Sequence, residues 1–147
     1  MSEQGVVIGL DIGDARTGIA RSDALQMMAF PHIVVSAKSD QDMAEAVAKE
    51  IRPLSPVRIV AGMPLDQNGM PGLQAKRVES LIGRLRELLD VEIVTQDERF
   101  STAEANRVAR EMNARGKKRK GKVDKIAATL ILQTWLDRQA SQRNMLR

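Results

Sequence analysis

The chain has 147 residues, of which 43% are apolar and 29% charged, and it contains no cysteine. This length and composition are typical of a globular protein, so we expect residues 1–147 to form a single domain. The missing cysteines exclude disulfides, thiolate metal sites and cysteine nucleophiles. The sequence has no signal-peptide pattern and no run of about 20 apolar residues, so we expect a cytoplasmic protein without a membrane span.

The net charge of +4 comes from one short segment. Residues 115–122, "RGKKRKGK", hold six cations and no anion, and the remaining chain has 17 basic and 19 acidic residues. A local basic patch is typical of a protein that binds a polyanion, whereas a solvated surface loop is the alternative interpretation. The cations that we expect to bind nucleic acid from this loop are Lys117, Lys118, Arg119, Lys120 and Lys122.

Three strands are predicted in the first quarter of the chain. Residues 5–11 form an apolar run rich in valine and isoleucine, which indicates a buried strand, and residues 17–23 and 28–35 follow as two more. Pro31 lacks a backbone N–H and therefore places the third strand at an edge of the sheet. The only histidine, His32, is expected to be a partly buried strand residue rather than a base or a metal ligand.

Helices and strands alternate in the rest of the chain. Strands are predicted at residues 57–62 and 91–95, and helices at 40–51, 73–89, 101–112 and from about 123 onward. Strands that are joined through helices are usually parallel. The predicted fold is therefore α/β and ribonuclease H-like: a mixed five-stranded sheet, three strands antiparallel and then two parallel, with helices on both faces and the first strand central.

Carboxylates are the remaining candidates for catalysis, because no serine lies in a nucleophile-elbow context. Asp11 closes the first strand, and Glu98 follows the fifth. Asp124 lies near the start of the last helix, about 20° around the helix axis from Ile131. The parallel strands bring Asp11, Glu98 and the segment 62–64 to one edge of the sheet, the edge at which open α/β sheets bind ligands.

Converging carboxylates repel one another unless a cation lies between them, and oxygen ligands favour Mg²⁺ or Mn²⁺. Two such ions roughly 4 Å apart can activate water for phosphodiester cleavage. Each acid also has an ordinary explanation: Asp11 as the acceptor of a turn, Asp124 as a helix N-cap, and Glu98 as an ion-pair partner of Arg99 or Arg16.

Four blocks, in order and spread over residues 7–137, resemble the YqgF/RuvX family of bacterial ribonuclease H-fold proteins. They read "GLDIGDARTGIARSD", "GMPLDQNG", "DERFSTAEA" and "KGKVDKIAATLILQTWLD". The resemblance implies a nuclease that matures pre-16S rRNA or resolves Holliday junctions. It also implies that Asp11, Glu98 and Asp124 are catalytic acids that bind two Mg²⁺ or Mn²⁺ ions.

The same blocks imply further site residues. Arg16 and Arg99 would contact phosphates. The residues expected to shape the site are Gly13, Gly62, Pro64, Asp97, Ser101 and Thr102. Asp14 departs from the family pattern, which usually has a small or hydroxyl residue there, and its role stays open between an outer metal ligand and a charge that repels the substrate.

The expected function is therefore a metal-dependent nuclease, a hydrolase that acts on a structured rRNA precursor or on branched DNA. A resolvase would need a homodimer to cut two strands symmetrically, whereas an RNA-trimming enzyme could act as a monomer. An ATP-binding fold of the actin and sugar-kinase type is disfavoured because it needs two domains. A non-catalytic nucleic-acid-binding module is the third alternative, although two Phe, one Trp and no Tyr offer little for base stacking.

Overall fold

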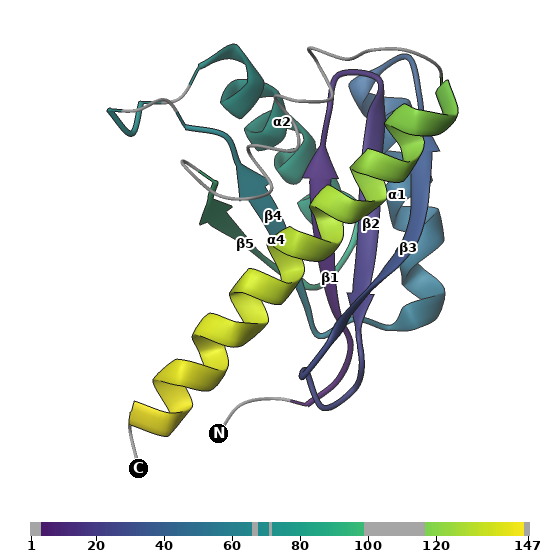
Figure 1. The fold of residues 1–147 in the computed structure, drawn as a ribbon. Helices are drawn as coiled ribbons and strands as arrows, with labels where there is room; N and C mark the ends of the chain where they lie inside the picture. Colours follow the sequence, from purple (N-terminus) through teal and green to yellow (C-terminus); the bar gives the residue numbers. More distant parts are fainter. Residues whose placement is uncertain (1–3, 66–67, 71, 99–116, 146–147) are drawn as a thin grey trace.

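A computed structural model describes residues 4–65, 68–70, 72–98 and 117–145, and gives only the backbone for residues 117–125. Five strands form one sheet in the order β3-β2-β1-β4-β5 (Figure 1). The strands are β1 (Val7–Ile12), β2 (Arg16–Ser22), β3 (Ala29–Ser36), β4 (Arg58–Met63) and β5 (Glu92–Asp97). β1, β2 and β3 pair antiparallel, whereas β4 pairs parallel with both β1 and β5. The predicted ribonuclease H-like sheet is confirmed, with β1 at its centre.

The edge position of β3 is also confirmed. Pro31 lies opposite Ala20 and Ile33 lies opposite Ile19, so the pairing of β2 with β3 skips His32 at a bulge. A bulge on an edge strand leaves one residue without a ladder partner, and proline is tolerated beside it. His32 is half-buried, as expected for an ordinary strand residue.

Helices cover both faces of the sheet. α1 (Asp40–Ile51), a short 3₁₀ turn (Arg52–Leu54) and α2 (Leu73–Leu88) lie on one face, and the long helix α4 (Lys117–Met145) crosses the other (Figure 1). α1 begins where predicted because the side chain of Ser39 accepts the backbone N–H of Asp42. The helix expected at residues 101–112 lies outside the described residues.

The start of the last helix differs from the prediction. A basic loop is expected at residues 115–122, but α4 already begins at Lys117, so the cations from Lys117 to Lys122 lie on a helix. Asp124 is the eighth residue of α4 and is therefore not its N-cap. Lysine and arginine are good helix formers, and the single Gly121 costs only about 1 kcal/mol, so the density of charge does not break the helix.

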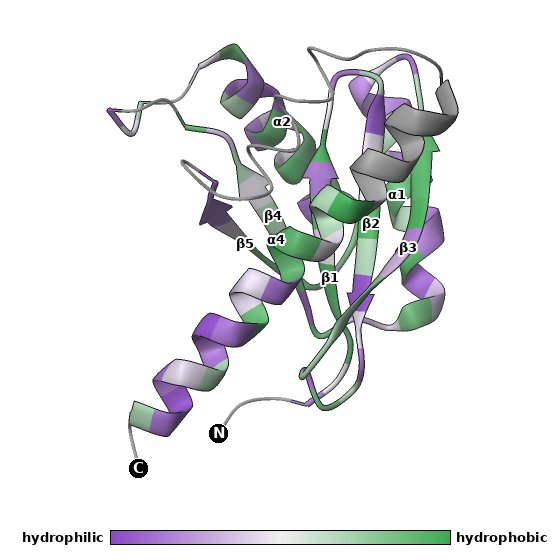
Figure 2. Ribbon diagram, in the orientation of Figure 1, coloured by the Kyte–Doolittle hydropathy of each residue, from purple (hydrophilic) through white to green (hydrophobic). Residues whose placement is uncertain are grey.

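The central strand β1 is buried on both of its faces, which explains its continuous apolar run. Ile8 and Leu10 join the core under α1 and α2, whereas Val7 joins the core under α4. Figure 2 shows the apolar middle of α4 over the sheet and a polar stretch toward its C-terminus. In the described parts of the chain, no helix is long and apolar enough to cross a bilayer.

α4 packs directly against the backbone of β1. A Cβ atom added at Gly9 would lie 2.7 Å from Cβ of Leu132 and 3.0 Å from the carbonyl oxygen of Ala128. Real Cβ atoms essentially never approach another atom to within 3.0 Å, so any larger residue at this position would force the helix away from the sheet.

A glutamine attaches α4 to the β2–β3 turn. Oε1 of Gln133 accepts the backbone N–H of Ala29 at 2.9 Å, and Nε2 donates to the carbonyl oxygen of Met27 at 3.1 Å. Within the same turn, Asp23 accepts the backbone N–H groups of Met28 and Met27, and these hydrogen bonds hold the pKa of its carboxyl group below its usual range. The contact of Gln133 is structural and lies in the middle of α4, nine residues after Asp124.

Candidate functional site

Asp11 lies on the α4 face of the sheet, at the carboxyl end of β1. Side chains alternate along a strand, so Asp11 shares a face with Gly9 and Val7, both of which lie under α4. Its side chain is buried, with 1% of its surface exposed. The strand end predicted from the sequence therefore carries a carboxylate that faces the helix rather than open solvent.

Gly62 provides space for the second acid. Leu10 pairs with Ala61, so Gly62 follows beside Asp11 on the neighbouring strand. A Cβ atom at Gly62 would lie 3.1 Å from Cγ of Glu98 and 2.7 Å from Cδ1 of Ile131. The absent side chain thus leaves room for both groups above β4.

Glu98 directly follows β5 and is as buried as Asp11, at 1% exposed. Its backbone N–H donates to the carbonyl oxygen of Met63 at 3.0 Å, which extends the parallel pairing by one residue beyond the strand. The carboxylate then turns over Gly62, toward α4. The topology predicted from the sequence brings Asp11 and Glu98 to the same edge and the same face of the sheet, on either side of β4.

Gln96 is the residue at this site that sequence reasoning missed. It lies next to Gly62 in the pairing of β4 with β5, and its Nε2 donates to Oε1 of Glu98 and to the carbonyl oxygen of Ile131, both at 3.0 Å. A signal was present in the sequence, because alternation places Gln96 on the same face as Val94, a partly buried residue that packs against the core under α4. A polar residue at an inward-facing position needs an explanation, and Glu98 supplies it.

The third expected acid, Asp124, lies on α4, seven residues before Ile131. Seven residues are almost two helical turns, or about 10 Å along the axis. The N-terminal part of α4 lies at the end of the sheet where β1 ends (Figure 1). Among the side chains that the structure describes, no three His, Cys, Asp or Glu residues form a cluster that could hold a metal, and the side chain of Asp124 is outside that set.

The donor atoms fit a hard divalent cation. Asp11 and Glu98 supply carboxylate oxygens, and both side chains are buried. Oxygen donors without histidine or cysteine suit Mg²⁺ and Mn²⁺. Two buried carboxylates on one face also favour a cation because their desolvation is costly without positive charge nearby.

The β1–β2 turn is held from the opposite side, by α2. Nη1 of Arg77 lies 2.6 Å from Oδ1 of Asp14, and Nε2 of Gln74 donates to the carbonyl oxygen of Ile12 at 2.6 Å. The N–H of Gly13 donates to the carbonyl oxygen of Arg16 at 2.8 Å and closes the turn. Asp14, whose role the sequence leaves open, thus has an exposed ion-pair partner on α2.

The remaining expected site residues are distributed as follows. Arg16 is the first residue of β2 and is half-buried, Pro64 follows β4, and Asp97 ends β5 with an exposed side chain. Arg99, Ser101 and Thr102 lie outside the described residues. For the cations at the start of α4 the structure gives the backbone alone.

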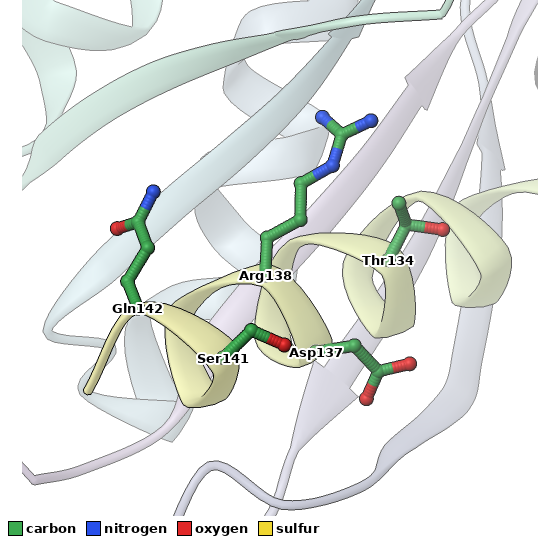
Figure 3. A pocket seen from close by; sticks show the side chains of 5 residues that line it. All are labelled: Thr134, Asp137, Arg138, Ser141 and Gln142. Atoms are coloured by element: carbon green, nitrogen blue, oxygen red, sulfur yellow. The ribbon is translucent and has the colours of Figure 1, made fainter. Parts of the chain in front are cut away.

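An open hollow of about 400 Å³ lies along α4 toward its C-terminus (Figure 3). It is lined by Thr134, Asp137, Arg138, Ser141 and Gln142. All five side chains come from one helix, and neither buried carboxylate is among them. The hollow is therefore separate from the candidate site.

A family model described as "RuvX: Holliday junction resolvase" matches residues 5–138. The chain belongs to the RuvX family. It is 36% identical to a protein of Roseiflexus sp. (strain RS-1) over 138 residues, 94% of this chain and 98% of that protein. It is 39% identical to a protein of Halothermothrix orenii over 133 residues, 90% of this chain and 95% of that protein. Both RuvX relatives are named "Putative pre-16S rRNA nuclease".

Solved structures share the fold of this RuvX chain at low sequence identity. T. thermophilus RuvC in complex with a Holliday junction substrate superposes with a TM-score of 0.58 at 13% identity, over 92% of this chain and 96% of that one. Fowlpox virus resolvase, in complex with Holliday junction DNA, superposes with a TM-score of 0.53 at 8% identity, over 91% of this chain and 98% of that one. These similarities establish the ribonuclease H-like architecture.

Proposed function

We propose that this RuvX-family chain is a metal-dependent nuclease that hydrolyses phosphodiester bonds in the maturation of the 5′ end of pre-16S rRNA. The observation that carries the proposal is the pair of buried carboxylates, Asp11 and Glu98, on one face at the carboxyl edge of parallel strands. Asp124 on α4 is the proposed third acid. The names of the RuvX relatives support the reaction class and favour RNA as the substrate.

Asp11, Glu98 and Asp124 would hold one or two Mg²⁺ or Mn²⁺ ions. Bound there, such ions lower the pKa of water and stabilise the leaving oxygen of a phosphodiester. The protein residues orient this chemistry: Gly62 leaves room for the Glu98 side chain, and Asp11 is buried on the face of the sheet that α4 crosses. Arg16, Arg99 and the cations between Lys117 and Lys122 would bind the phosphate backbone, which positions the strand without reading its sequence.

Resolution of Holliday junctions is the second candidate, and the description of the matching family model favours it. Symmetrical cutting of two strands needs two active sites, so this function requires a homodimer, whereas trimming of rRNA does not. The two candidates share the same acids and differ in substrate and assembly. The test therefore offers both substrates to one preparation.

The first prediction concerns Asp11→Asn, assayed on a pre-16S rRNA fragment and on a four-way DNA junction with Mg²⁺ or Mn²⁺. We expect cleavage to fall at least about 1,000-fold, or roughly 4 kcal/mol in activation free energy, because a carboxylate ligand is lost. EDTA should abolish wild-type cleavage. Nucleic-acid binding, measured by fluorescence anisotropy, should persist.

Asp14→Asn is the matched control, because it makes the same chemical change three residues away, at an exposed ion pair. It should cleave at the wild-type rate. Undiminished cleavage by Asp11→Asn would contradict the proposed site. Faster cleavage of the junction than of the RNA, together with a dimer in solution, would favour the resolvase.

A further inference from the structure

We propose that Gln96 is a positioning residue that fixes the carboxylate of Glu98 relative to α4. The inference deepens the proposed nuclease function and rests on it. It adds to the acids a residue that does not touch the substrate but determines where one of those acids points.

The contacts of Gln96 connect three elements. Its side chain is buried, at 4% exposed, and one amide nitrogen donates both to Oε1 of Glu98 and to the carbonyl oxygen of Ile131. Ile131 lies inside α4, where its carbonyl already serves the helix, and its second lone pair can accept the N–H from Gln96. A single NH₂ group therefore joins the end of β5, the Glu98 side chain and the helix.

Glu98 directly follows β5, where the hydrogen bond from its backbone N–H to Met63 fixes the main chain but not the carboxylate. A glutamate side chain loses considerable rotamer freedom when it is fixed, and a catalytic group has to be held within about 0.5 Å of its working position. Gly62 provides space for the glutamate but no restraining side chain. The hydrogen bond from Gln96 restrains the carboxylate itself.

The second hydrogen bond of Gln96 connects the restrained carboxylate to α4. Ile131 belongs to the helix that carries Asp124, so Gln96 links the position of Glu98 to the helix that supplies the third proposed acid. Acids on separate elements can hold the same ions only when those elements keep a fixed spacing. Gln96 is placed to maintain that spacing at the buried end of the site.

Gln133 allows this role to be separated from simple attachment of the helix. It is also a glutamine that ties α4 to the sheet through two hydrogen bonds, but at the β2–β3 turn. Gln96→Met and Gln133→Met each replace an amide by a thioether of similar length. The first removes one hydrogen bond between the sheet and α4, and the second removes two bonds between α4 and the β2–β3 turn. Only the first removes a hydrogen bond to Glu98.

The second prediction compares these two variants by three measurements: kcat and KM for cleavage, Mn²⁺ binding without nucleic acid, and urea unfolding. We expect Gln96→Met to lower kcat and to weaken Mn²⁺ binding, each by about 10- to 100-fold, with substrate KM unchanged, because second-layer partners of metal ligands have effects of this size. Gln133→Met should keep the wild-type kcat and Mn²⁺ affinity. Both variants should unfold at lower urea concentrations than the wild type.

Equal kcat and equal Mn²⁺ affinity in the two methionine variants would overturn the positioning role. Should Gln96→Met fail to fold, Gln96→Asn keeps a polar amide at the site but is one carbon too short to span both acceptors, and it should show the same losses. A wild-type protein that cleaves neither substrate would refute the proposed nuclease. The comparison of Mn²⁺ affinities would then decide the role of Gln96 by itself.

Discussion

The two faces of the sheet are built differently. Under α1 and α2 the core consists of large apolar side chains, including Leu10, Ile59 and Leu85, all fully buried. Under α4 the described core also contains large side chains such as Ile131 and Leu132, but the helix rests directly on the backbone of β1 at Gly9. The described carboxylates that are buried, Asp11 and Glu98, both belong to the α4 side.

We expect this difference to place most of the fold's stability on one face of the sheet and the proposed catalytic acids on the other. A thick apolar core contributes roughly 25 cal/mol for each Å² of apolar surface that it buries, and it needs no particular orientation of any polar group. Burying a carboxylate is costly unless its partners are placed accurately. We infer that the α1 and α2 side holds the sheet together, whereas the close approach of α4 brings a helix within reach of acids at the strand ends.

The third prediction tests that separation with a large side chain from each face. Leu85→Ala and Ile131→Ala each remove a fully buried side chain and should lower the free energy of unfolding by about 2–5 kcal/mol. Only Ile131→Ala should also reduce kcat, because its Cδ1 packs over Gly62 beside Glu98. Urea unfolding and cleavage at a temperature where both variants are folded provide the measurements. An equal loss of kcat in Leu85→Ala would show that catalysis depends on both faces of the sheet and not on the α4 side alone.

The fourth prediction compares two glycines, one from each side. Gly9→Ala should destabilise the fold by about 1–3 kcal/mol and reduce cleavage, because the new Cβ would push Leu132 and α4 away from β1. Gly83→Ala on α2 has no atom within 4 Å of the new Cβ and should stabilise the protein by about 0.5–1 kcal/mol through helix propensity. Thermal unfolding of both variants measures the difference. Stabilisation by Gly9→Ala would contradict the close contact.

Much of the fold could be predicted because its signals are local. β1, β4 and β5 follow apolar runs, α1 follows its Ser39 cap and α2 its apolar stripe, and the chain order then determines the sheet. The convergence of Asp11 and Glu98 follows from that order as well, since parallel strands end at one edge.

The remaining features depend on contacts between distant parts of the chain or on a misleading local signal. The basic segment 115–122 indicates a loop by its charge, but charge alone does not set backbone conformation, and α4 begins at Lys117. Gln96 meets Ile131 across 35 residues, and Arg77 meets Asp14 across 63. No spacing rule within one element predicts such pairs, because they exist only after the sheet and its helices have packed.

The fifth prediction, with the smallest expected effect, concerns the ion pair between Asp14 and Arg77. Asp14 has the same charge as Asp11 three residues earlier, but its side chain is 77% exposed and pairs with α2. A double-mutant cycle of Asp14→Ala and Arg77→Ala should give a coupling of about 0.2–1 kcal/mol in urea unfolding, because water and salt screen an exposed pair. Neither variant should change metal affinity. A loss of Mn²⁺ binding in Asp14→Ala would instead make Asp14 an outer ligand and extend the chemistry of the α4 side into the β1–β2 turn.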